Sequence, residues 1–95
     1  GNGCVKAPSI VENLKIERQE MDRSIVNLNW DKAPGAFGYN IRFGTQKDKL
    51  YSNYQVTGVE SLTIRSLNSS QKYYFTIDAF NENGITKGKN IIELN

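Results

Sequence analysis

The chain has 95 residues, a length that suits one small domain and leaves no room for a second hydrophobic core. Hydrophobic residues make up 38% and aromatic residues 11%, a composition that argues against a disordered chain and for a packed core. Because the 12 basic and 10 acidic residues are spread along the sequence, and no apolar run is long enough to cross a bilayer, neither nucleic acid nor membrane insertion is expected.

Residues 1–7 contain glycine and asparagine without periodicity, and we expect a linker or the end of a preceding domain. The single cysteine, Cys4, has no partner for an internal disulfide. The Gly3-Cys4 pair also fits a lipid-anchored cysteine, but no apolar stretch precedes it, which favours a free thiol. Pro8 opens the domain, which is expected to span residues 8–95.

From Pro8 onward, short runs of alternating apolar and polar residues are separated by turn residues, a pattern typical of an all-β fold. The first three strands are expected near residues 11–18, 24–31 and 39–43, with a loop at 31–38 that contains proline and glycine. Their apolar residues are Val11, Leu14, Ile16, Ile25, Leu28, Trp30, Tyr39, Ile41 and Phe43.

Four further strands are expected near residues 51–57, 62–65, 73–80 and 85–94, the first of them at a sheet edge. The run over 73–80 alternates most clearly, which places every second residue in the core. Its inward residues are Tyr73, Phe75, Ile77 and Ala79.

Seven short strands in a chain of this length favour an immunoglobulin-like β-sandwich of two packed antiparallel sheets. The pair Asn83-Gly84 predicts the last hairpin, because both residues tolerate positive φ. The core expected between the sheets consists of Trp30, Tyr39, Ile41, Phe43, Leu62, Ile64, Tyr73, Phe75 and Ile77.

The order of these residues resembles the fibronectin type III family over residues 8–95. Trp30 stands where the family has a buried tryptophan at the end of its second strand. Leu67, followed six residues later by Tyr73, is similar to the family's tyrosine corner, in which the hydroxyl bonds the upstream backbone. Ser69 departs from the family, which often has proline there, so the corner is expected to be less rigid.

The stretches 38–44, 48–51 and 73–84 look like the C-terminal type III modules of glycoside hydrolases from gut Bacteroidetes. This resemblance implies a non-catalytic accessory module, a spacer or packing domain whose partner is the neighbouring catalytic domain of the same chain. It also implies a periplasmic or extracellular location as part of a larger exported protein. A carbohydrate-binding or protein-interaction module is the alternative, with polysaccharide as the weaker candidate partner.

The sequence offers no catalytic machinery of its own. Without histidine, no Ser-His-Asp or Cys-His arrangement is available. Ten acidic residues are enough to supply the two carboxylates that a glycosidase needs. They fall mostly in turns and on outward strand positions, however, and a small sandwich is not expected to have a deep cleft. One cysteine without histidine supplies too few ligands for zinc, and the acids lack the spacing of a calcium loop, so neither metal nor cofactor is expected.

The outward positions of the third and sixth strands form the candidate interaction face. Arg42 and Asp78 are expected to pair across the ladder if these strands are neighbours, and the outward rings suit a partner domain or a sugar. Individual cover of each ring by long neighbours is an equally weighted alternative. The six residues of this face are Asn40, Arg42, Tyr74, Thr76, Asp78 and Phe80.

Overall fold

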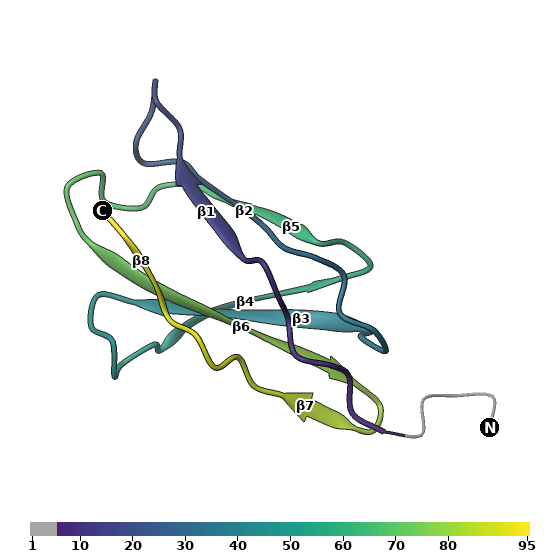
Figure 1. The fold of residues 1–95 in the computed structure, drawn as a ribbon. Helices are drawn as coiled ribbons and strands as arrows, with labels where there is room; N and C mark the ends of the chain where they lie inside the picture. The colour runs from purple at the N-terminus through teal and green to yellow at the C-terminus, as the bar shows by residue number, and fades with distance from the viewer. Residues whose placement is uncertain (1–5) are drawn as a thin grey trace.

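The computed structural model describes residues 6–95, which form two facing layers of β-strands (Figure 1). The eight strands are β1 (Lys15–Arg18), β2 (Val26–Asn29), β3 (Gly38–Gly44), β4 (Ser52–Thr57), β5 (Ser61–Ile64), β6 (Tyr73–Asn81), β7 (Gly84–Thr86) and β8 (Ile92–Leu94). The all-β sandwich is confirmed, with eight strands instead of the expected seven. The prediction about the thiol of Cys4 lies outside the described residues.

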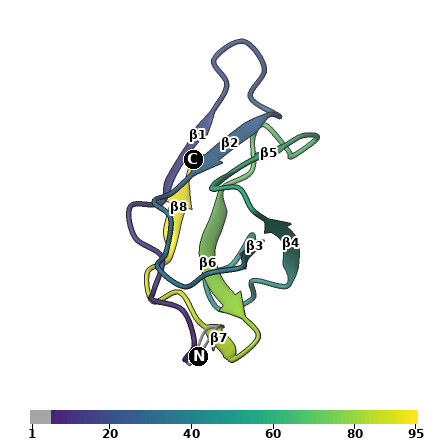
Figure 2. The same ribbon diagram turned by 90° about the vertical axis from the view of Figure 1, so that its right-hand side faces the viewer.

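One layer contains the antiparallel strands β1, β2 and β5 in that order. The other has the order β4-β3-β6-β7, with β8 also paired to β6, so β6 pairs with three strands of this layer. The strand β4 is an edge strand, as predicted. The domain is elongated, at 48 × 26 × 18 Å, and its β6–β7 hairpin lies at the opposite end from the β1–β2 loop (Figure 2).

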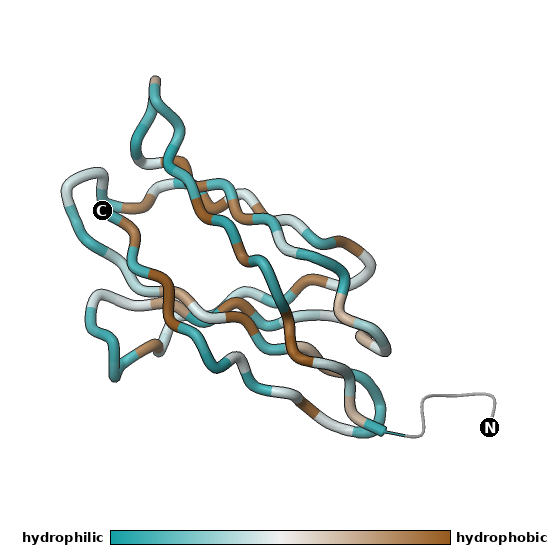
Figure 3. The backbone as a smooth tube through the Cα atoms, in the orientation of Figure 1, coloured by the Kyte–Doolittle hydropathy of each residue, from teal (hydrophilic) through white to brown (hydrophobic). Residues whose placement is uncertain are grey.

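The core consists of buried apolar side chains from both sheets. Hydrophobic segments occur along the chain in both layers (Figure 3). Eight of the nine predicted core residues are buried, and Leu62 packs against them half-buried. The second strand lies within its expected range of 24–31 but is shorter: Ile25, named among its apolar residues, is half-buried before β2 begins, whereas Val26 is fully buried. Strand periodicity explains this, because Val26, Leu28 and Trp30 stand at alternate positions and Ile25 does not.

The tyrosine corner is present. The hydroxyl of Tyr73 accepts a hydrogen bond of 2.8 Å from the backbone amide of Asn68, five residues upstream. The guanidinium of Arg18 lies 5.7 Å from the centre of the Tyr73 ring and donates to the carbonyl oxygens of Asn68 and Gln71. With serine at position 69, the turn is held instead by the side chain of Asn68, whose Oδ1 accepts from the amide of Ser70 at 2.9 Å.

The expected strand over 85–94 is wrong as a continuous element, because it divides into β7 and β8 around a bulge at 87–91. Thr86 pairs with Ala79 and Ile92 pairs with Phe75, so five residues of the last strand stand opposite three of β6. Gly88 is required here, because a Cβ atom at this position would lie 2.4 Å from the carbonyl oxygen of Ile77.

The hairpin predicted from Asn83-Gly84 is confirmed, but its centre is one residue earlier. Asn81 pairs with Gly84, which leaves Glu82 and Asn83 as the two turn residues. Only Gly84 of the expected pair has positive φ, at 149°. The side chain of Asn81 stabilises the turn instead, since its Oδ1 accepts from the amide of Asn83 at 2.8 Å.

We expect Tyr73→Phe to lower the free energy of unfolding by about 1–3 kcal/mol, because the amide of Asn68 loses its partner in a partly buried corner. Chemical denaturation measures this change. Tyr74→Phe is the matched control on the opposite face and should change stability by less than about 0.5 kcal/mol. Equal losses from the two substitutions would contradict the assignment of the corner to Tyr73.

We expect Gly88→Ala to destabilise the domain by about 1–3 kcal/mol, because the added methyl group meets backbone that has no room to move. The exposed neighbour Lys87→Ala is the control and should be nearly neutral. Thermal unfolding of the two variants checks this. A Gly88→Ala domain as stable as the parent would mean that the bulge is not fixed as described.

Candidate interaction face

The six predicted residues lie on one face of the five-stranded sheet, opposite to its core face. In the β3–β6 register Asn40 stands opposite Asp78, and Arg42 stands opposite Thr76. Tyr74 and Phe80 stand opposite the glycines at the two ends of β3. Adjacent strands therefore bring the six side chains together as the alternation of the sequence indicates.

Arg42 and Asp78 form the predicted ion pair, with more burial than an exposed pair. Nε of Arg42 lies 2.8 Å from Oδ2 of Asp78, and Nη2 lies 2.9 Å from Oδ1, a bidentate geometry. The side chain of Asp78 is 4% exposed and that of Arg42 is 28% exposed. Hydrogen bonding to this carboxylate raises the pKa of Arg42 above its ordinary value, so the guanidinium stays charged.

Two of the six residues are covered by the bulge and do not face solvent. Oδ1 of Asp78 also accepts from the amide of Gly88 at 2.9 Å, and Oγ1 of Thr76 donates to the carbonyl of Asn90 at 2.9 Å. Thr76 and Asp78 are 2% and 3% exposed as a result. They hold the bulge in place, and the accessible part of the face belongs to their neighbours.

The sequence did contain a signal for this bulge. The segment 87–90, Lys-Gly-Lys-Asn, interrupts the apolar alternation of the last strand, and an isolated glycine within a strand pattern indicates a bulge or a close backbone approach. The prediction of one continuous strand over 85–94 did not include this bulge.

At the hairpin end of the face, three apolar side chains form a cluster, Phe37, Phe80 and Ile85. The rings of Phe37 and Phe80 have centroids 6.2 Å apart, and Ile85 pairs directly with Phe80 across the β6–β7 ladder. The Phe80 ring lies over Gly38, where a Cβ atom would meet it at 2.6 Å. Phe37 is 65% exposed and Ile85 is 57% exposed, so the cluster presents apolar surface to solvent. Sequence reasoning found Phe80 and missed the other two.

At the other end of the face, a hollow of about 450 Å³ lies over β3 and β6, between the loop that precedes β4 and the bulge. Its charged lining residues are Arg42, Lys47, Asp48 and Lys89. Tyr51 also lines it and is 83% exposed. Tyr54 belongs to the other side of the sheet, where its ring stacks on Phe43 at 5.8 Å.

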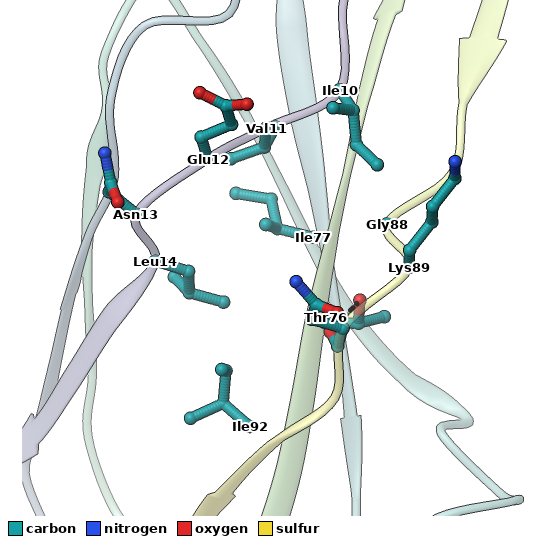
Figure 4. Close-up of a pocket in the computed structure, with 11 residues that line it drawn as sticks. Ile10, Val11, Glu12, Asn13, Leu14, Thr76, Ile77, Gly88, Lys89 and Ile92 are labelled. Atoms are coloured by element: carbon teal, nitrogen blue, oxygen red, sulfur yellow. Dashed lines mark hydrogen bonds between the residues drawn. The ribbon is translucent and has the colours of Figure 1, made fainter.

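A second concave region, of about 590 Å³, opens at the edge of the sandwich. Figure 4 shows the segment from Ile10 to Leu14 on one side, the segment with Gly88 and Lys89 on the other, and Ile77 between them. This groove exists because residues 10–14 precede β1 and do not join either sheet. Its lining contains one carboxylate, that of Glu12, and so lacks the carboxylate pair that glycoside hydrolysis needs.

Asp78 is the one buried acid within residues 6–95. It forms an ion pair with Arg42 and accepts a hydrogen bond from the amide of Gly88. The same residues contain no cluster of three side chains able to ligate a metal ion. They also contain no helix suited to crossing a membrane.

A family model described as the fibronectin type III domain matches residues 6–94. Among solved structures, an Fn3-like protein from Clostridium thermocellum has a TM-score of 0.82 at 23% identity, over 95% of this chain and 94% of that chain. The fn3 domain of human contactin 1 has a TM-score of 0.74 at 19% identity, over 99% of this chain and 86% of that chain. No curated protein is similar enough in sequence to count as a relative.

The likeness to these structures concerns the fold, since both lie below 25% identity. The family model covers nearly the whole chain, and the buried tryptophan and the tyrosine corner stand where the family has them. The chain therefore belongs to the fibronectin type III family, whose domains are commonly non-catalytic modules.

Proposed function

We propose that this domain is a non-catalytic accessory module of a larger exported bacterial glycosidase, in which it spaces and packs against the neighbouring catalytic domain. The observation that carries the proposal is the exposed apolar cluster of Phe37, Phe80 and Ile85 at one end of the domain. Apolar surface gathered at an end, next to where the chain enters the sandwich, suits an interface between domains.

The chain is firmly held where it enters this end. Nδ2 of Asn81 donates to the carbonyl oxygens of Lys6 and Gly35 at 2.9 and 3.0 Å, and Oγ1 of Thr86 donates to the carbonyl of Pro8 at 2.5 Å. The hairpin beside the apolar cluster therefore fixes the direction of residues 6–8. Such an attachment supports a spacer that sets the orientation of its neighbour.

The far end of the domain is held in a similar way. Arg18 and Arg23 both donate to the main-chain oxygen of Asn95, at 2.9 and 3.1 Å. Arg18 also donates to the carbonyl of Arg23 at 2.6 Å, which joins the β1–β2 loop to the end of β8. Hydrogen bonds thus hold the chain against the domain at residues 6–8 and at Asn95. This supports a spacer that keeps the domains on its two sides at a fixed relative orientation.

The glycosidase as parent rests on the similarity of stretches 38–44, 48–51 and 73–84 to type III modules of such enzymes, and the periplasmic or extracellular location follows from that parent. The gene sequence upstream of residue 1 tests this part. A catalytic glycosidase domain preceded by an export signal would support it, and a different upstream domain would refute the parent while leaving the packing proposal open.

The packing proposal predicts that Phe37→Ser with Ile85→Thr leaves the isolated domain nearly as stable as before, because both side chains are mostly exposed. In the full-length protein the same pair should weaken the interface by about 1.5–3 kcal/mol for each side chain that the neighbour buries. Calorimetry of both proteins measures the difference.

Met21→Ser is the matched control, since Met21 is 97% exposed and lies in the β1–β2 loop at the opposite end. It should change neither protein. If the Phe37 and Ile85 substitutions leave the full-length protein unchanged as well, the cluster is not an interface.

For neutral plant-type oligosaccharides, we expect affinity no better than about millimolar, because the depression of about 440 Å³ beside Phe80 and Ile85 is open and does not surround a ligand. Titration of the labelled domain with xylan and arabinan fragments, followed by amide chemical shifts, checks this. Saturable shifts at submillimolar concentration on Asn40, Phe80 and their neighbours would favour a carbohydrate-binding module over a spacer.

A further inference from the structure

The hollow at the bulge end of the face has a charge pattern that the spacer role does not use. Three cationic side chains, Arg42, Lys47 and Lys89, line it together with one acid, Asp48. Neither lysine forms an ion pair within the described part of the chain. Lysine side chains left unpaired around a concave surface concentrate positive potential there.

Arg42 at the floor of the hollow is preorganised. Asp78 engages its Nε and Nη2 atoms and is itself fixed by the amide of Gly88, so the guanidinium is held in one position. The remaining nitrogen, Nη1, takes no part in that pair. A fixed guanidinium loses little freedom when it donates to a further oxyanion.

The rim adds apolar surface beside the charges. Tyr51 directly precedes β4 and its side chain is exposed, and Ile91 in the bulge is 42% exposed. The volume of about 450 Å³ falls within the range of small-molecule sites. An aromatic face next to cations suits a ligand that has both a ring with apolar C–H faces and a negative charge.

We propose that this hollow binds a carboxylated sugar, a uronate residue of an acidic saccharide, with its ring on Tyr51 and its carboxylate among Arg42, Lys47 and Lys89. This proposal does not rest on the proposed spacer function. A nucleic acid fits less well, because a phosphodiester backbone needs cations repeated along its length and the chain has a formal net charge of only +2. An acidic peptide that adds to a sheet would use an edge, whereas side chains of β3 and β6 form the floor here.

Titration of the labelled domain with trigalacturonate at low ionic strength tests the proposal. We expect saturable amide shifts at Arg42, in the loop 47–51 and in the bulge 87–91, and weaker binding as salt is raised. Fully methyl-esterified trigalacturonate is the matched neutral ligand, because it keeps the ring and removes the charge. It should bind at least about three-fold more weakly, since the two exposed lysines and the free Nη1 of Arg42 then have no carboxylate to contact.

Variants separate the two parts of the site. Lys47→Gln with Lys89→Gln should weaken trigalacturonate binding by about three- to ten-fold, and Tyr51→Ala by a similar factor. Lys15→Gln, an exposed lysine of β1 in the other sheet, should leave binding unchanged. The dispersion of the amide spectrum shows in each case that the variant is folded.

Four outcomes would overturn the proposal. These are equal binding of the methyl ester, an unchanged affinity after the double lysine substitution, equal shifts with inorganic sulfate alone, and tighter binding of a short single-stranded DNA or an oligoaspartate peptide. The sulfate result would mark a site for simple anions, and the last result would assign the hollow to a different macromolecule.

Discussion

The five-stranded sheet depends on the hydrogen bonds that the carboxylate of Asp78 accepts from Arg42 and Gly88. A buried charge is unfavourable unless its hydrogen bonds are satisfied, and this one is satisfied from two directions. Arg42 supplies two donors from β3, and Gly88 supplies an amide from the bulge that links β7 to β8. Asp78 on β6 therefore holds β3 on one side and the bulge on the other. Removal of the acid would leave the guanidinium of Arg42 and the amide of Gly88 without this partner.

Sequence alone sufficed for the parts of this fold that follow from alternation. The inward residues of β6 are Tyr73, Phe75, Ile77 and Ala79, and all four are buried as the strand period predicts. The tyrosine corner was expected from the resemblance of the Leu67-to-Tyr73 spacing to the fibronectin type III family, and the structure contains it. At these positions the local sequence pattern and the tertiary packing favour the same structure.

The remainder depended on contacts between segments far apart in the sequence. Alternation assigned Thr76 and Asp78 to the outward side correctly, but only the path of the bulge shows that they are covered. Phe37 lies in a loop, so no strand period predicts that its ring meets Phe80. The hollow beside Tyr51 joins a loop, two strands and the bulge, and a juxtaposition of that kind is visible only after the chain has folded.

The bulge also bears on the behaviour of the domain in crowded solution. A sandwich with open sheets has outer strands whose free amides and carbonyls can template pairing with another molecule, the first step toward aggregation. In this domain β7 and β8 together form one such outer border of the larger sheet, and each has only three residues. The five residues between them leave the ladder, so no long regular border remains on that side. The irregularity that anchors Asp78 thus also disfavours pairing of this border with another molecule.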